Sequence, residues 1–332
     1  MTARRLASLT ATAVTAMVAL TGVTQAFDLQ GHRGARGLAP ENTLEAFATA
    51  LSIGVTTLEL DISMTKDGVL VIHHDVWLNP DTTRGPDGAF LAQRGPAVHA
   101  LTLAEVKRYD VGRLKPGSQY AANFLEQRAV DGARIPALTE LFDLVARSGT
   151  HHVRFNIETK LTPATGADTS DPPTFAAALA GAIRAAGLTA RAAVQSFDWR
   201  TLQELRRIAP EIARVCLSAQ QRRFDTIQQG RPGASPWTAG LDVDDFDGST
   251  PKLVAAAGCS VWSPAFRDLT PERLAEAKRL RLAVIPWTVN EHAEMERLVA
   301  MGVDGLITDY PDRLRTVLSE RNLPLPPTVA IR

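Results

Sequence analysis

The sequence predicts an α/β fold in which eight parallel strands close into a barrel surrounded by helices. Nine β-rich runs occur along the chain, and one of them is too close to its neighbour to be a parallel partner, which leaves eight. Most of the eight are followed by helical stretches rich in Ala, Leu and Arg. Eight such units in a chain of 332 residues fit a TIM (β/α)8 barrel. The expected strands cover residues 27–32, 57–63, 69–74, 152–160, 192–197, 213–217, 259–263, 282–288 and 303–308.

Residues 1–26 have the features of an export signal. Arg4 and Arg5 precede an uncharged stretch, and Thr24-Gln25-Ala26 places small residues at the two positions that a signal peptidase reads. A retained N-terminal anchor is the alternative, but the apolar stretch is short and diluted by threonine. We therefore expect an exported protein, periplasmic or secreted, whose mature domain spans residues 27–332.

Charge balance and cysteine content exclude several classes of protein. Lys and Arg together number 36, as do Asp and Glu, so the chain has no basic excess for nucleic acid or an anionic membrane. Only Cys216 and Cys259 occur, which excludes a disulfide-rich scaffold. One disulfide can form, but their positions in apolar runs of two expected strands favour two buried, unpaired thiols.

The first helix is expected after Pro40, where Leu44, Phe47 and Leu51 recur with helical spacing and Gly54 ends the pattern. Only five residues separate the expected strands 57–63 and 69–74, and a parallel crossover needs about a dozen. This pair must therefore be an antiparallel hairpin, with Asp67-Gly68 in its turn. Further helices are expected over residues 174–187, 199–208, 271–280 and 291–301.

Residues 79–135 interrupt the alternation of strands and helices. They are rich in Gly, Pro, Arg and Asp, and contain one short helical piece near residues 101–109. A stretch of this length without a clear element is usually functional or an insertion. We interpret it as a small subdomain over the mouth of the barrel.

Carboxylates are expected to gather inside the barrel. The strand that contains Glu59 and Asp61 alternates, so both carboxylates share the inward face opposite three apolar residues. Glu158 and Lys160 share the inward face of the strand 152–160 in the same way. Buried carboxylates repel one another unless a cation lies between them, and a divalent metal with oxygen ligands satisfies this need. The alternative is an interior layer of salt bridges formed by the same four residues.

Histidines end two neighbouring segments. His32 ends the first strand, and His73 and His74 end the hairpin arm, where adjacent side chains face opposite sides and only one can aim at the carboxylates. Histidines, carboxylate metal ligands, arginine and lysine together suit phosphoryl transfer, because cations stabilise the spreading negative charge and histidines move protons.

These residues resemble the glycerophosphodiester phosphodiesterase family, over residues 29–315. The N-terminal pieces that carry the resemblance are Gly31-His32-Arg33-Gly34, Pro40-Glu41-Asn42-Thr43, Ala46-Phe47, Glu59-Leu60-Asp61, Thr65-Lys66-Asp67-Gly68 and His74-Asp75. The later pieces are Ile157-Glu158-Thr159-Lys160, Gln195-Ser196-Phe197, Trp287-Thr288-Val289-Asn290 and Ile307-Thr308-Asp309-Tyr310-Pro311. The ordered set is specific, although each piece alone is not.

The resemblance implies a TIM barrel with a small insertion after the His-Asp hairpin, and one divalent metal ion, Ca²⁺ or Mg²⁺. It assigns three kinds of role: metal ligands Glu59, Asp61 and Glu158; an acid–base pair His32 and His74; phosphate-binding Arg33 and Lys160. His74 is chosen over His73 because the motif places its histidine directly before Asp. The implied partner is a small glycerophosphodiester, cleaved to glycerol 3-phosphate and an alcohol.

Two departures from the family pattern affect the pocket rim. Gln195-Ser196 stands where many relatives have two small hydroxyl residues, and the insertion is longer than in the smallest members. A lysophospholipase D activity is therefore an alternative, with an apolar groove formed by insertion residues. A catalytically silent barrel that binds phosphodiesters is a second alternative. The insertion residues considered for the groove are Tyr109, Leu114, Tyr120, Phe124 and Leu125.

Other polar and aromatic residues carry weaker predictions. Trp287 can stack on the substrate or serve only in rim packing. An acidic loop can bind Ca²⁺, but its spacing fits an EF-hand poorly and favours a solvated face. The acidic loop comprises Asp244, Asp245 and Asp247, and the histidines expected to be structural or solvent-facing are His99, His151, His152 and His292.

Overall fold

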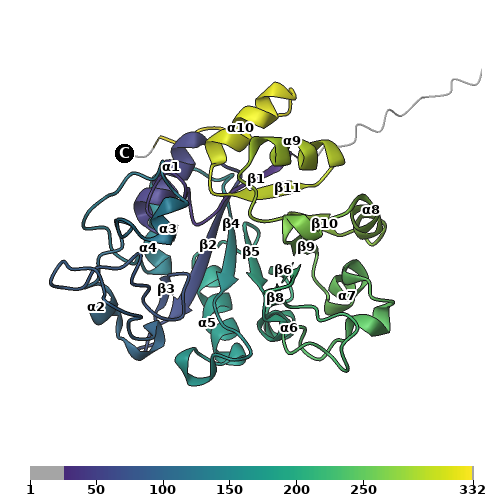
Figure 1. The fold of residues 1–332 in the computed structure, drawn as a ribbon, viewed down its shortest axis with the longest axis horizontal. Helices are drawn as coiled ribbons and strands as arrows, with labels where there is room; N and C mark the ends of the chain where they lie inside the picture. The colour runs from purple at the N-terminus through teal and green to yellow at the C-terminus, as the bar shows by residue number, and fades with distance from the viewer. Residues whose placement is uncertain (1–25, 331–332) are drawn as a thin grey trace, which may run out of the picture.

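The computed structural model describes residues 26–330, and its core is a nearly closed barrel of parallel strands (Figure 1). Within these residues the order of the parallel strands around the barrel is β10-β9-β6-β5-β4-β2-β1-β11. Backbone hydrogen bonds from Asp304 to Val284 and from Ile307 to Pro286 bring the two ends together. The predicted TIM barrel is confirmed. The parallel strands are β1 Asp28–Gly31, β2 Thr57–Met64, β4 Arg154–Thr159, β5 Ala192–Ser196, β6 Ala213–Ser218, β9 Val261–Pro264, β10 Ala283–Val284 and β11 Gly305–Thr308.

Helices pack around the outside of the barrel (Figure 1). In α1, Thr43 caps the amino end by accepting a hydrogen bond from the Ala46 amide, and Gly54 ends the helix in the left-handed conformation. The main helices are α1 Leu44–Ile53, α4 Leu138–Arg147, α5 Pro172–Ala185, α6 Trp199–Ile208, α7 Thr250–Ala257, α8 Pro271–Arg279, α9 His292–Met301 and α10 Pro311–Glu320. Short helical turns are α2 Leu103–Val106, α3 Gln119–Ala122, η1 Val98–Ala100, η2 Gly166–Asp168, η3 Val243–Phe246 and η4 Phe266–Asp268.

The expected hairpin forms between β2 and β3 Leu70–Ile72. The two strands pair antiparallel, with Ile62 opposite Ile72, and Gly68 in the turn has a φ of +80°. This positive φ explains why glycine occupies the turn. A second hairpin, β7 Gln220–Gln221 with β8 Phe224–Asp225, follows β6 and was not anticipated from the sequence.

Strand β2 separates its side chains as the alternation predicts. Leu58, Leu60 and Ile62 are buried in the core cluster together with Phe47 of α1. Their neighbours Glu59 and Asp61 are also buried, but their carboxylates meet Glu158 of β4. The apolar face of the strand therefore packs on helices, while the acidic face points into the barrel.

The segment of residues 79–135 has a small hydrophobic core of its own. Val71 of the hairpin anchors this second cluster, which includes Leu78, Val98, Val106 and Ile135. Later in the same segment, Gln127 and Arg128 hydrogen-bond to the backbone of residues 36–38 at the carboxyl side of β1. The insertion is thus fastened both to the hairpin and to the rim of the barrel.

The prediction of two unpaired thiols is wrong. Cys216 and Cys259 are buried as expected, but they form a disulfide with a Cα–Cα distance of 5.9 Å. Cys216 lies on β6, and Cys259 lies just before β9, the neighbouring strand in the sheet, so the barrel brings together residues that are 43 apart in sequence. No helix among residues 26–330 is long and apolar enough to cross a membrane. The expected export signal, residues 1–26, lies almost wholly outside the described residues.

Candidate active site

A pocket of about 190 Å³ opens at the carboxyl ends of the strands. This is the end at which TIM-barrel active sites are built. Segments that follow β1, β3, β5 and β10 supply its rim, and β2 and β4 supply its floor. The pocket brings together His32, Arg33, Glu59, His74, Glu158, Lys160 and Trp287, with Arg36, Gln195, Phe197, Leu217, Thr288 and Ile307 completing the lining.

Glu59 and Glu158 line the floor of the pocket, and the buried Asp61 adjoins them without lining it. Asp61 and Glu158 are direct partners in the parallel pairing of β2 and β4, and Glu59 lies two residues earlier on the same face. One oxygen from each carboxylate lies within 4.8 Å of the others. Among residues 26–330 this is the group of acidic, histidine or cysteine side chains whose geometry could hold a metal ion.

The two predicted phosphate-binding cations contact these carboxylates. Lys160 Nζ lies 2.7 Å from Glu158 Oε1 and 3.5 Å from Asp61 Oδ1. Arg33 Nε lies 3.1 Å from Asp61 Oδ2, and its Nη1 donates to Glu41 at 2.6 Å. The salt-bridge layer considered from the sequence therefore exists in part, but within the described part of the chain the Glu59 carboxylate pairs with no arginine or lysine side chain.

Burial and mutual repulsion make it costly for all three carboxylates of the triad to be ionised at once. Burial, together with the negative charges of Asp61 and Glu158, raises the pKa of Glu59 well above its usual value. Burial also raises the pKa of Glu158 to about 7, although Lys160 opposes the shift. Burial opposes ionisation of Asp61 as well, but Arg33 and Lys160 outweigh it and hold its pKa well below the usual range. Among residues 26–330, Asp61 Oδ1 accepts no hydrogen bond and has only the distant Lys160 Nζ at 3.5 Å, so the triad fits a bound cation with oxygen ligands.

Each predicted catalytic histidine is held by a carboxylate at Nδ1. His32 Nδ1 lies 2.6 Å from Asp309 Oδ1, and His74 Nδ1 lies 2.6 Å from Asp75 Oδ1. An ionised carboxylate can only accept, so each Nδ1 carries the proton and each Nε2 is left with a lone pair. Burial is the largest cause that lowers the pKa of both rings to about 4, with nearby arginines adding to the shift. Both rings are therefore neutral at pH 7 in the metal-free protein.

His73 and His74 both border a small cavity beside the insertion, but only His74 also lines the larger pocket. His73 is buried, and its Nε2 has no hydrogen-bond partner among the described residues. It lines a small cavity of about 20 Å³ with Val111 and Ile135 of the insertion, and it is absent from the lining of the larger pocket. The choice of His74 over His73 as the site histidine stays a prediction.

Sequence reasoning missed several residues that position the site. Asp309 was noted only as part of a motif, yet it holds both His32 and Arg36. Asn42 donates to Asp61 Oδ2 at 2.9 Å, from a left-handed backbone conformation with a φ of 56°. Asp309 directly follows β11, so the rule that drew attention to polar residues at strand ends could have found it. Asn42 was likewise noted only as part of a motif, and it does not end a strand.

Aromatic side chains line one wall of the pocket. Trp287 packs edge-to-face on Phe197 at 5.2 Å, and Phe197 packs on Phe224 at 5.1 Å. Trp237 extends the row, 5.7 Å from Phe224, which is partly exposed on the β7–β8 hairpin. Trp287 thus lies at the inner end of a wall that leads from the catalytic pocket towards the surface.

The remaining predicted positions lie outside the pocket. His99 bonds to the Met64 carbonyl, and His292 lies near Glu320 on the exterior. In the acidic loop, Asp244 accepts from the Gly230 amide and Asp247 pairs with Lys252. These contacts support structural roles.

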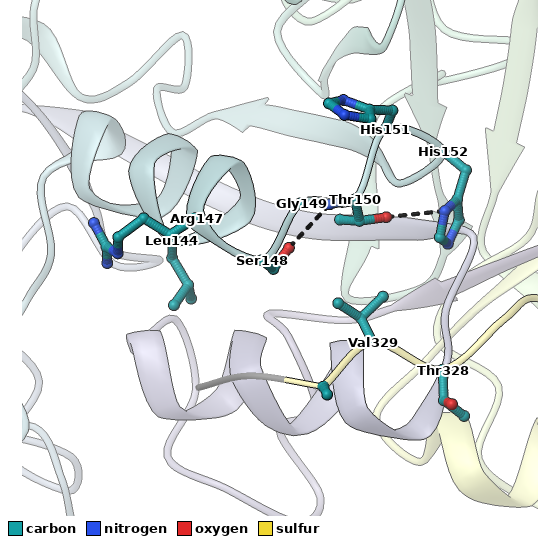
Figure 2. Close-up of a pocket in the computed structure, with 10 residues that line it drawn as sticks. Leu144, Arg147, Ser148, Gly149, Thr150, His151, His152, Thr328 and Val329 are labelled. Atoms are coloured by element: carbon teal, nitrogen blue, oxygen red, sulfur yellow. Dashed lines mark hydrogen bonds between the residues drawn. The ribbon is translucent and has the colours of Figure 1, made fainter.

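A larger open groove of about 860 Å³ lies at the other end of the barrel (Figure 2). The end of α4, the loop before β4 and residues 328–330 border it, and His152 bonds there to Thr150. Arg147, His151 and His152 line this groove but no carboxylate does, so it lacks the acidic groups that the smaller pocket assembles.

The fold and the pocket together define a TIM-barrel protein with paired histidines over a buried acidic triad. The chain matches the glycerophosphoryl diester phosphodiesterase family over residues 32–313 and belongs to that family. A glycerophosphodiester phosphodiesterase of Caldanaerobacter subterraneus is 29% identical over 283 residues, which are 85% of this chain and 94% of the relative. A glycerophosphodiester phosphodiesterase of Bacillus subtilis is 28% identical over 86% of this chain and 84% of its own length.

Solved structures agree with the fold. A protein of Silicibacter pomeroyi, provisionally designated a glycerophosphoryl diester phosphodiesterase, is 37% identical with a TM-score of 0.80, covering 90% of this chain and 95% of its own. A phosphodiesterase of Oleispira antarctica, solved with the product sn-glycerol-3-phosphate, is 22% identical with a TM-score of 0.61, covering 87% and 96%. At that identity the second likeness shows the fold alone.

Proposed function

We propose that the protein hydrolyses glycerophosphodiesters to glycerol 3-phosphate and an alcohol. The observation that carries this proposal is the pocket itself. Two imidazoles, each oriented by a carboxylate, face a buried acidic triad in a chain of the glycerophosphoryl diester phosphodiesterase family. Small diesters of glycerol with choline or ethanolamine are the proposed substrate class.

Glu59, Asp61 and Glu158 would hold one divalent cation, Ca²⁺ or Mg²⁺. Both ions prefer oxygen ligands, and the triad offers only carboxylate oxygens. When bound, the cation would supply a positive charge that stabilises the negative charge spreading over the phosphoryl oxygens. It would also allow all three buried carboxylates to ionise together.

His32 and His74 would act as the general base and the general acid. With Nδ1 held by a carboxylate, each ring presents Nε2 for proton transfer. A neutral ring is ready to accept a proton from the attacking hydroxyl, which belongs either to water or to the substrate's own glycerol. The negative charge of a bound phosphodiester favours protonation of the other ring, which then donates to the departing alcohol.

Arg33 and Lys160 would hold the phosphate oxygens. Both now pair with carboxylates of the triad or next to it. A cation among those carboxylates would take over part of this neutralising role and leave N–H donors for the phosphate. Trp287 would contact the alcohol or the glycerol, because its aromatic wall borders the same pocket.

None of the five insertion residues considered for lysophospholipids lines the pocket, although Tyr120 and Phe124 pack on each other at 5.4 Å. Leu114 borders the small cavity next to His73. Tyr109 packs on the insertion core, the Tyr120 hydroxyl bonds to Glu41, and Phe124 is buried beneath Arg36. Leu125 is 87% exposed, away from that packing. Because these residues do not line the pocket, we favour small glycerophosphodiesters over lipids with an acyl chain as substrates.

Release of glycerol 3-phosphate tests the proposed activity. The purified protein would be assayed on glycerophosphocholine, glycerophosphoethanolamine and a lysophospholipid, with and without a chelator. Turnover of the first two, abolished by the chelator and restored by Ca²⁺ or Mg²⁺, is the expected result. Binding of these diesters without turnover would instead favour the silent barrel.

We also propose that the protein is exported. The signal-like residues 1–26 motivate this proposal, and the Cys216–Cys259 disulfide supports it, since disulfides persist in oxidising compartments. Mass spectrometry of protein from the periplasm or the medium should find Phe27 as the first residue. Full-length protein confined to the cytosol would reject export.

A further inference from the structure

A row of buried amide side chains crosses the barrel interior beneath the acidic triad. Gln30 on β1, Asn156 on β4 and Gln195 on β5 are each at most 3% exposed. Asn156 Nδ2 donates to Gln30 Oε1 and to Gln195 Oε1, both at 2.9 Å. TIM-barrel interiors are usually filled by branched apolar residues, so three linked amides in this position call for an explanation.

The row ends at a carboxylate on each side. Gln30 Nε2 donates to Asp28 Oδ2 at 3.0 Å, at the amino end of the barrel. Gln195 Nε2 donates to Glu59 Oε1 at 2.6 Å, in the acidic triad. The contacts therefore connect the bottom of the barrel to one predicted metal ligand without interruption.

With a cation bound, Glu59 would be ionised, and the carboxylates of Glu59 and Asp28 at the two ends would then determine the direction of every amide between them. A carboxylate can only accept, so Gln30 and Gln195 must each turn an NH₂ group outward and a carbonyl inward. The side-chain carbonyls of Gln30 and Gln195 then both need a hydrogen-bond donor between them. Asn156 donates one N–H of its amide to each of them. Its own carbonyl has no hydrogen-bond partner within residues 26–330, so the contacts with the two glutamines, and not the pairing of this carbonyl, set its orientation.

In this orientation the Gln195 amide donates an N–H to Glu59 Oε1. A flipped Gln195 amide would instead place its carbonyl oxygen against the carboxylate. The other oxygen, Oε2, accepts from the Arg33 amide at 2.9 Å. One donor on each oxygen holds the carboxylate plane from two sides, and each oxygen keeps a second lone pair for a cation.

We propose that Gln195, oriented by Asn156, is a positioning residue that holds the Glu59 carboxylate in the geometry that binds the divalent metal. This inference rests on the proposed metal site and goes beyond it, because neither amide is a metal ligand. Hydrogen bonds from neighbouring side chains to a metal ligand commonly tune metal affinity.

Metal affinity measured by isothermal titration calorimetry, with Ca²⁺ and Mg²⁺ and no substrate, tests the proposal. Gln195→Met keeps the length of the side chain but removes the donor, and it should raise the dissociation constant about 10-fold or more. Asn156→Leu keeps the shape but removes both donors, and it should also weaken binding although Asn156 does not touch Glu59. The double variant should be no weaker than Gln195→Met alone, because both changes break one chain.

Ser263→Ala is the matched control, since Ser263 is a fully buried polar residue of β9 that lies outside the amide row. Its metal affinity should stay within twofold of the wild type, which separates positioning from a general loss of interior polarity. Circular dichroism would confirm that each variant folds. If both amide variants fail to fold, Asp28→Asn at the far end of the row replaces them, and it should weaken binding by allowing Gln30 to flip.

The outcomes separate this inference from the proposed function. If the wild type binds the cation tightly and either folded amide variant binds it with the same affinity, the inference is wrong but the proposed metal site is kept. No binding of either cation by the wild type rejects the metal site, and the inference with it.

Discussion

Asp309 Oδ1 accepts a hydrogen bond from His32 Nδ1 at 2.6 Å, although the two residues are 277 positions apart in the chain. Arg36 donates hydrogen bonds to both oxygens of the same carboxylate, at 2.8 and 2.9 Å, and Asn290 donates to Oδ2 at 2.7 Å. The carboxylate is almost completely buried, so these partners keep it ionised and fixed. It therefore determines both the tautomer and the orientation of His32.

Asp309→Asn should lower the rate by about 10²–10⁴, the size of one acid–base role. The amide can present an N–H to Nδ1, which moves the ring proton to the wrong nitrogen. Steady-state kinetics would measure the loss, which should appear in kcat more than in KM. Metal affinity should be unchanged, because Asp309 lies outside the triad. A variant with normal kcat would remove Asp309 from the mechanism.

The ionised Asp309 carboxylate should contribute to stability in a way that acid denaturation can measure. Burial opposes its ionisation, but Arg36 and His32 outweigh burial and hold the pKa of Asp309 far below its usual range. The unfolded chain then takes up a proton below about pH 4 while the folded protein does not, so the contribution to stability is present above that pH and lost below it. The free energy of unfolding of the wild type should fall more steeply than that of Asp309→Asn, by about 1.4 kcal/mol per pH unit. Parallel curves for the two proteins would contradict this linkage.

His32→Ala and His74→Ala should each lower turnover by about 10²–10⁴. Their combined loss should be less than additive if the two rings act as a unit. A nitrophenyl ester, whose leaving group needs no proton, should rescue the variant that lacks the acid. Equal losses on both types of substrate for both variants would argue against divided roles.

His73→Ala is the internal control for the histidine pair. Its ring is buried against the insertion, so it should lose packing but little catalysis. A kinetic loss as large as that of His74→Ala would mean that the wrong histidine had been assigned.

Glu59→Ala, Asp61→Ala and Glu158→Ala should each abolish metal binding and activity without preventing folding. A ligand that binds only the folded state stabilises it, by about 2.7 kcal/mol at 100 times the dissociation constant. Thermal unfolding should show this metal-induced stabilisation in the wild type and in Asp245→Ala, a change in the acidic loop, but in none of the three variants. A triad variant that keeps normal metal stoichiometry would not have lost a ligand.

Cys216→Ala together with Cys259→Ala should lower stability by about 2–4 kcal/mol, because the bond restricts an unfolded loop of 43 residues. Denaturant unfolding would measure the difference, and mass spectrometry after alkylation should find no free thiol in the wild type. Two alkylated cysteines in protein recovered from an oxidising compartment would contradict the disulfide.

Much of the fold was predictable because its signals are local. The alternation in β2 placed Glu59 and Asp61 opposite Leu58 and Leu60, and the short link to β3 required a hairpin. The expected strand 282–288 is regular only over Ala283–Val284, since Pro286 has no N–H to donate. Its backbone still pairs with β9 through Ile285 and Trp287, so the strand is interrupted but not absent.

Residue types and motif order by themselves determined the family, the barrel and the residues that meet in the pocket. Tertiary structure alone decided which distant partners control them: Asp309 for His32, Gln195 for Glu59, and Cys259 for Cys216. Strand periodicity tells which way a side chain points, because the chain imposes alternation from one residue to the next. It does not tell which side chain from another strand lies opposite, because that depends on how the strands are staggered when the barrel closes.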